Sequence, residues 1–224
     1  MPNYINASSV QIHGNIFRDS YANSYATSID CNNIQWTNNS MVSAFDSFSN
    51  LASVTNISST VTNMQGAFSN CSKLTNTPSI PGSVIDMGSS FNNCVNLTTA
   101  PIIPASVINM NNTFEYCSNL ITAPTIPNSV TNMYYTFANC INLTGDIYIY
   151  SNNITDATEC FGSTTLPKSI YIPFTYANGE YTQTYNSFIA AGYTTLPPSP
   201  CNAILYDISG QIITQWGNFI LPEA

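Results

Sequence analysis

Charged side chains are scarce in this chain: 6% of its 224 residues are Asp, Glu, Lys or Arg, about a quarter of the usual share. Three basic residues, Arg18, Lys73 and Lys168, stand against eleven acidic ones, for a formal net charge of −8. Because binding to a phosphate backbone requires clustered positive charge, we expect no nucleic-acid partner. No apolar run approaches the roughly 18 residues of a membrane span, so no membrane insertion is expected.

Neutral polar residues take the place of the missing charges. The chain contains 30 Asn, 27 Ser and 25 Thr, while 44% of it is hydrophobic, which is ordinary for a chain that folds. Its length suffices for one fair-sized domain or two small ones. The start of the sequence has neither the basic nor the apolar stretch of a secretion signal, so we expect no export through a secretion channel.

A repeat of 23 residues organises the middle of the chain, from about residue 34 to about 173. There are about five and a half copies, and the last is one residue out of phase. The aligned columns include Met64, Met87, Met110 and Met133; Phe68, Phe91, Phe114 and Phe137; and Cys71, Cys94, Cys117 and Cys140. One copy is too small to bury its own apolar side chains, so the copies must stack and each column becomes a structural ladder. The sequence therefore predicts a repeat solenoid.

Each copy has two parts with different local preferences. Met, Phe, Cys and Leu stand at i, i+4, i+7 and i+10, which predicts a short helix of one to two turns. The remainder, for example Leu97 to Pro104, is extended in character and rich in Pro, so its strands should be very short. We expect short β-strands on one face of the solenoid and short helical turns on the other.

The repeated motif resembles a known family. Ile126-Pro-Asn-Ser-Val-Thr-Asn-Met133, followed by Phe137-Ala-Asn-Cys140 and Asn142-Leu-Thr144, is similar to the BspA-like leucine-rich repeats, also called Treponema-type repeats. Two details depart from the family pattern: Met replaces the usual Ile before the Phe, and one residue has moved from the Met-to-Phe segment to the Leu-to-Pro segment. The resemblance implies a leucine-rich-repeat solenoid in a curved stack, and a role of the kind found in bacterial surface adhesins and phage fibre proteins.

The two ends do not follow the repeat. We assign residues 1–33 to an N-terminal cap or docking arm, 34–173 to the solenoid, and 174–224 to a C-terminal cap, with both caps rich in β-structure. Within the C-terminal cap, residues 181–192 predict a helix, 196–200 a stiff Pro-rich linker, and 203–216 a β-hairpin around Ser209-Gly210.

The sequence offers little catalytic chemistry. Seven cysteines, four of them 23 residues apart, indicate buried free thiols, with a disulfide or a metal site as the weaker alternatives. His13 is the only imidazole. Asp146, Asp156 and Glu159 form the densest acidic group, yet a glycosidase needs two carboxylates across a cleft and a Ca²⁺ site needs more oxygens. We therefore expect no enzyme activity, no cofactor and no metal.

The informative positions are those at which the copies differ. Glu115, Tyr116, Tyr134 and Tyr135 stand where other copies carry small or amide residues, so they should cluster on adjacent coils. Tyrosine offers a large contact area at low entropic cost and stacks on sugars or on protein chains. These four residues are the candidate ligand or partner contact. The alternative is that the tyrosines only cover a subunit contact or flank the core.

These observations, with the resemblance, favour a non-enzymatic bacteriophage virion protein, a fibre or decoration subunit that attaches to the host surface. We expect it at the virion surface, docked to other virion proteins through a terminal segment, and assembled as a homotrimer that protects its exposed edges. Its target would be a host surface glycan or protein. The alternatives are a bacterial cell-surface adhesin that binds host matrix proteins or other microbes, and a structural plug without a ligand.

Overall fold

The computed structural model describes residues 4–6, 11–12, 26–32, 34–164, 170–172, 183–191, 205–206 and 212–213. The strands are β1 (Tyr4–Asn6), β2 (Gln11–Ile12), β3 (Ser28–Asp30), β4 (Gln35–Trp36), β5 (Ser53–Thr55), β6 (Ile147–Tyr148), β7 (Ile170–Tyr171), β8 (Leu205–Tyr206) and β9 (Ile212–Ile213). The helical elements of these residues are the 3-10 helix η1 (Thr37–Asn39) and α2 (Gln183–Ala190). His13, Cys201 and the Pro-rich linker at 196–200 lie outside the described residues.

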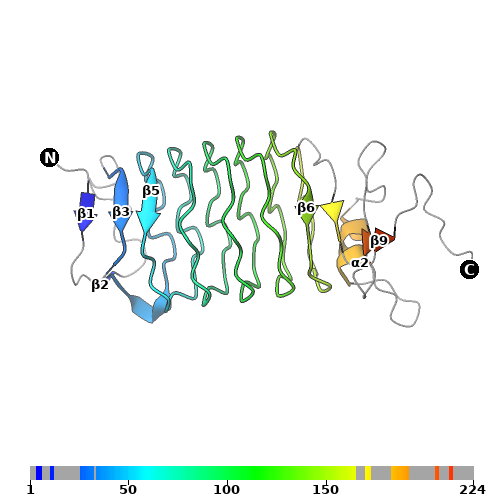
Figure 1. Ribbon diagram of the computed structural model, residues 1–224, viewed down its shortest axis with the longest axis horizontal. Coiled ribbons are helices and arrows are strands. Elements are labelled where there is room, and N and C mark those ends of the chain that lie inside the picture. The colour runs from blue at the N-terminus through cyan, green and yellow to red at the C-terminus, as the bar shows by residue number, and fades with distance from the viewer. Residues whose placement is uncertain are drawn as a thin grey trace, which may run out of the picture.

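Successive coils lie side by side in chain order along the long axis of the molecule (Figure 1). Parallel pairing joins β1 to β3 and β3 to β5, and likewise β2 to β4 and β6 to β7. Elsewhere the coils meet through single-residue parallel bridges, which join Ser40 to Asn63, Asn63 to Asp86, Asp86 to Asn109, Asn109 to Asn132, and Asn132 to Asp156. The offset is 23 residues in each of these pairs except the last, where it is 24, which confirms the one-residue shift of the last copy.

The segment predicted as a short helix forms tight turns instead, so that prediction is wrong. In the coil of Met64, alternate N–H groups donate to the next coil, as from Met64 to the Asp86 carbonyl at 2.9 Å. The intervening ones close three-residue turns, as from Ala67 to the Met64 carbonyl at 2.9 Å. Two residues per turn segment have φ between 48° and 66°, as at Gly66 and Asn70. A left-handed residue stops a right-handed helix, so these positions set the turn geometry.

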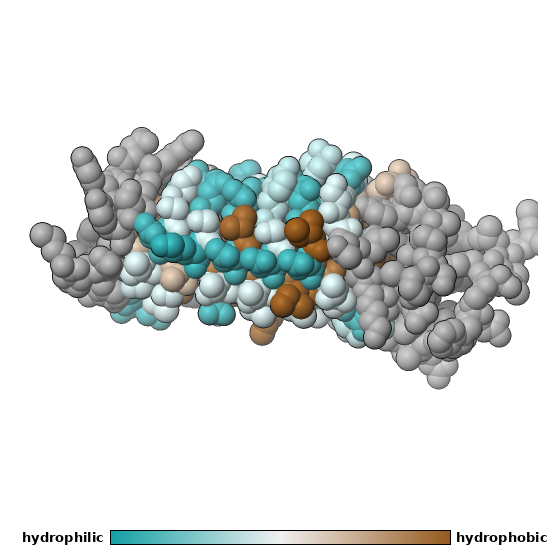
Figure 2. Space-filling model, turned by 90° about the horizontal axis from the view of Figure 1, so that it is seen from above, coloured by the Kyte–Doolittle hydropathy of each residue, from teal (hydrophilic) through white to brown (hydrophobic). Residues whose placement is uncertain are grey.

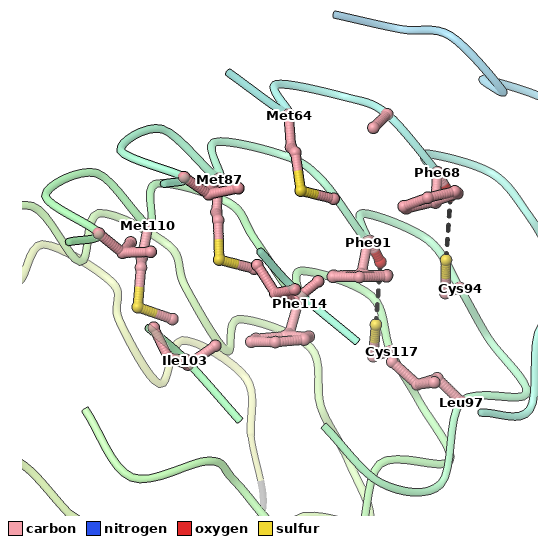
Figure 3. Packing of buried hydrophobic residues seen from close by; sticks show 14 of the residues in the cluster. Met64, Phe68, Met87, Phe91, Cys94, Leu97, Ile103, Met110, Phe114 and Cys117 are labelled. Atoms are coloured by element: carbon pink, nitrogen blue, oxygen red, sulfur yellow. Dashed lines mark hydrogen bonds between the residues drawn. The ribbon is translucent and has the colours of Figure 1, made fainter. Parts of the chain in front are cut away.

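The core is a set of aligned columns running the length of the stack. The Met, Phe, Cys and Leu columns are fully buried, and the Phe rings of neighbouring coils are stacked at 5.4–5.7 Å between centroids from Phe45 to Phe161. Figure 3 shows the Met and Phe rows and two of the thiols that donate to Phe carbonyls of the preceding coil. The Cys117 Sγ lies 3.1 Å from the Phe91 carbonyl oxygen. In the last coil Thr164 stands in the Cys column, and its hydroxyl donates to the Phe137 carbonyl at 2.6 Å.

Aromatic and hydroxyl side chains finish the two ends of the Phe stack. Trp36 meets Phe45 edge to face at 6.1 Å, and Phe188 of α2 packs against Phe161 at 6.3 Å. The buried Thr184 hydroxyl accepts from the Ile154 N–H at 3.0 Å and donates to the Ser151 carbonyl at 2.6 Å. The Ser187 hydroxyl of α2 donates to the Ile154 carbonyl at 2.6 Å, where the matching Val107 carbonyl accepts from Ser129 of the next coil, so α2 takes the place of a further coil here.

Parallel pairing also extends ahead of the predicted solenoid start, because β1 at residues 4–6 pairs with β3. At the other end, β8 and β9 pair antiparallel, with Leu205 opposite Ile213, which confirms the predicted hairpin. The predicted helix within 181–192 is α2. The boundaries assigned at residues 33 and 173 stay predictions.

Candidate functional site

Two left-handed backbone columns cross the turn segments of the coils. The first contains Ser43, Gly66, Ser89, Asn112, Tyr135 and Glu159, and the second contains Ser47, Asn70, Asn93, Tyr116, Asn139 and Ser163. Gly and Asn adopt positive φ at low cost, whereas Tyr does so rarely. At Tyr116 φ is 61° and at Tyr135 it is 53°, so the fold places two bulky side chains where most other coils carry small or amide ones. Such strain of about 1–3 kcal/mol per residue is concentrated at functional positions in proteins.

Tyr134 and Tyr135 form one contiguous aromatic surface. Their ring centroids are 4.4 Å apart and their planes are tilted by 47°. Tyr134 is 38% exposed and Tyr135 is half-buried. Partial desolvation raises the pKa of Tyr135 above its ordinary value of 10.0, and the neighbouring Tyr134, Glu159 and Glu115 raise it further. Two carboxylates therefore act on this aromatic pair.

Glu115 is held in place by amides from two coils. Its Oε2 accepts from the Asn92 side chain at 2.9 Å and from the Asn112 side chain at 2.7 Å. Asn112 also donates its backbone N–H to the Tyr134 carbonyl at 2.8 Å, which ties Glu115 to the coil of the aromatic pair. The carboxylate position is thus fixed by the stack itself.

Glu159 is a member of this cluster that our reasoning from the sequence missed. It is exposed and follows Tyr135 in the left-handed column, and Tyr135 donates its N–H to the carbonyl of the adjacent Thr158 at 2.9 Å. A side chain at Gly162 would collide with the Glu159 carboxylate, so the carboxylate lies over the glycine. The signal in the sequence was the one-residue shift of the last copy, which puts Glu159 in the column of Tyr135.

The four predicted contact residues are therefore not all equivalent. The structure brings together Glu115, Tyr134 and Tyr135, whereas Tyr116, which is 50% exposed, belongs to the second left-handed column between Asn93 and Asn139. Their role in contacting a ligand or partner stays a prediction.

A view from above shows the chemistry of the side of the solenoid that faces upward in Figure 1 (Figure 2). A hydrophilic band runs along the described coils, and hydrophobic side chains appear beside it as separate spots. Exposed isoleucines such as Ile85 at 45% and Ile102 at 90% contribute to the apolar surface of the molecule. Scattered apolar side chains on a polar surface are ordinary for a folded protein.

Few side chains in the described part of the chain are placed to take part in catalysis. Burial raises the pKa of the thiols, to about 12 for Cys94 and Cys140, so they stay protonated and unreactive at neutral pH.

A depression of about 290 Å³ lies between the last coil and α2 and is lined by residues including Asp156 and Gln183. Its lining contains one carboxylate, whereas glycoside hydrolysis needs two. No group of three or more His, Cys, Asp or Glu among the described residues could hold a metal ion. None of the helices described is long and apolar enough to cross a membrane.

Comparison with known proteins defines the family. The profile of the BspA type leucine rich repeat region matches residues 4–121 and 67–187, with six copies, so the chain belongs to this family and is a repeat solenoid. Among solved structures, a leucine-rich-repeat protein of T. pallidum is similar, with 19% sequence identity, a TM-score of 0.47, and coverage of 82% of this chain and 77% of that chain. No curated protein matches the chain.

Proposed function

We propose that this chain is a non-enzymatic bacteriophage virion protein that displays its solenoid for attachment to the host surface. The observation that carries the attachment role is the placement of exposed tyrosines on a rigid stack. Tyr116 and Tyr135 occupy left-handed positions at which Asn or Gly would fold with less strain. A tyrosine at a position where it strains the backbone is best explained by a contact that its ring makes with a ligand or partner.

The surface chemistry supports a binding role rather than catalysis. Around the tyrosines the solenoid presents Asn, Ser and Thr, which hydrogen-bond neutral polar ligands without the desolvation cost of charges. Membership in the BspA type repeat family supports a surface or adhesion role. We place the protein at the virion surface, with a host glycan or protein as its target.

The particle assignment is tested by composition. Mass spectrometry of gradient-purified phage particles should find this chain at a fixed ratio to the other virion proteins, and light scattering of the untagged protein should give the mass of a homotrimer. Trimer formation would protect the ends of the stack, and a terminal segment would dock to the particle. Absence from the particles would contradict the virion role. A membrane-associated form on bacterial cells would favour the alternative, a bacterial surface adhesin.

The attachment role is tested with matched tyrosine variants. Purified protein should bind to host cells, and the double variant Tyr116→Asn with Tyr135→Asn should bind at least fivefold more weakly, because both rings are removed while Asn suits the left-handed backbone. Tyr150→Asn is the control, since Tyr150 is 56% exposed and lies outside both columns. Equal binding by the double variant and the wild type would contradict the attachment surface.

A further inference from the structure

We propose that Glu115, Tyr134, Tyr135 and Glu159 form a binding site for the ammonium groups of an amino-substituted surface polysaccharide. The inference rests on the proposed attachment role and names the chemistry of its target. It depends on the geometry of the two carboxylates and the aromatic pair, and on the neutral amides around them.

The two carboxylates approach the aromatic pair from opposite directions along the stack. Glu115 comes from the preceding coil and Glu159 from the following one, and both charges act on Tyr135. The Glu159 carboxylate lies over Gly162, which stands in the same column of the stack as Glu115, with Ala138 between them. The site therefore presents two negative charges beside two exposed or half-exposed rings.

No basic side chain among the described residues neutralises these carboxylates. Of the described residues only Lys73 is basic, and its Nζ lies 2.6 Å from the Asn50 side-chain oxygen in the first part of the solenoid. Glu115 is bound by neutral amides, which orient the carboxylate and leave its charge. An anionic ligand would be repelled here, and a cationic group is the electrostatic complement.

The rings make an organic cation the best match. A tyrosine face attracts an ammonium group placed within about 6 Å of the ring centroid, and a nearby carboxylate adds to this attraction. Because the rings of Tyr134 and Tyr135 pack together with their centroids 4.4 Å apart, each ring restricts the other, which lowers the side-chain freedom lost on binding. A hydrated metal ion would gain nothing from the rings.

The neighbouring side chains favour a sugar over a basic peptide. The Asn111 side chain donates to Asn112 at 3.0 Å, and Asn112 and Asn92 donate to Glu115, so amides line the preceding coils. Planar amides beside an aromatic surface match the hydroxyl groups and the apolar ring face of a pyranose. A basic peptide would use the carboxylates, but it has no pyranose ring face to pack against the tyrosines.

The test compares two oligosaccharides of the same length, one with free ammonium groups and one in which each amine is acetylated and therefore uncharged. Calorimetric titration of the purified full chain with the tetramer of glucosamine, at a pH at which its amines are protonated, should show binding at least tenfold tighter than with the tetramer of N-acetylglucosamine. Binding should weaken with added salt. Tyr135→Asn should weaken it by about fivefold or more, and Glu159→Gln by about threefold.

A remote carboxylate separates a specific site from general attraction to an acidic protein. Asp46 stands in the same column of the stack as Glu115, three coils away, and Asp46→Asn removes the same charge while keeping an oxygen for the Asn70 amide. This variant should bind as the wild type does. An equal loss for Asp46→Asn and Glu159→Gln would overturn the site, and so would equal binding of the two tetramers.

The remaining outcomes address the source of the ammonium group and the proposed function separately. A lysine-containing peptide that bound more tightly than the glucosamine tetramer would overturn the polysaccharide assignment. Because the titrations use the purified chain, absence of the protein from phage particles would contradict the virion role and would leave the measured ammonium binding unaffected.

Discussion

The buried thiols predict that this protein loses stability steeply in mild alkali. The six cysteines among the described residues are free and buried, and burial raises the pKa of each well above the ordinary value of 9.0, to about 12 for Cys31 and Cys94. In the unfolded chain the same thiols ionise near their ordinary value. Between these two pKa values the unfolded state has released protons that the folded state still holds, so unfolding becomes more favourable as pH rises.

The magnitude follows from the number of thiols. Each contributes about 0.4 kcal/mol of destabilisation when the pH equals the unfolded pKa and about 1.4 kcal/mol in total one pH unit above it. For six thiols the loss relative to neutral pH is about 2.5 kcal/mol at about pH 9 and about 8 kcal/mol at about pH 10. A domain with an ordinary stability of about 5–15 kcal/mol would be close to unfolding at the upper value.

Urea unfolding followed by circular dichroism, repeated between about pH 7 and about pH 10, measures this slope. Thiolate absorbance from these six cysteines should stay absent in the folded protein and appear on unfolding, which separates the thiols from the tyrosines. Cys117→Ser removes one titrating group and should reduce the slope by about 1.4 kcal/mol per pH unit. A free energy of unfolding constant within about 1 kcal/mol over this range would refute the reasoning.

Two further predictions concern coupling within the stack. The first uses double-mutant cycles with Phe→Leu substitutions, measured by urea unfolding. Phe91 and Phe114, whose ring centroids are 5.7 Å apart, should show a coupling free energy of about 0.5–1.5 kcal/mol. Phe91 and Phe137 lie two coils apart, so their effects should be additive within about 0.5 kcal/mol. Thr184→Val leaves the Ile154 N–H without its partner and should cost about 1–3 kcal/mol, with faster amide exchange in the last coil, while Thr184→Ser keeps both hydrogen bonds and should cost less than half as much.

The repeat and its core could be predicted from the sequence because the same apolar residues recur every 23 positions. The turn geometry could not, since the spacing of Met, Phe, Cys and Leu fits one face of a helix as well as a row of tight turns. The distinguishing signal is the recurrence of Gly, Asn and Ser at one slot, as in Gly66, Ser89 and Asn112, where φ is positive. Where such residues recur at one slot, turns should be predicted even if the apolar spacing also fits a helix.

The candidate site was predictable to the extent that it depends on differences between copies. Glu115, Tyr134 and Tyr135 differ from their counterparts and fall together, because adjacent copies are adjacent in space. Tyr116 differs as well, yet it lies in the other left-handed column. Glu159 was missed because the inserted residue moves it by one position, so that correct alignment of the last copy requires the bridge between Asn132 and Asp156.

The stack explains how such a surface can change without loss of the fold. Alternate backbone N–H groups are satisfied by the next coil, and the thiol and hydroxyl columns donate to buried carbonyls, so the exposed positions between them contribute little to folding. The thiols need no oxidation to perform this role, because the six cysteines among the described residues are free and buried, and those of the Cys column donate to carbonyls. A fold held together in this way is independent of the redox state of its surroundings. That property suits a protein assembled inside a cell and later exposed outside it, and it supports the proposed place on a particle that leaves its host.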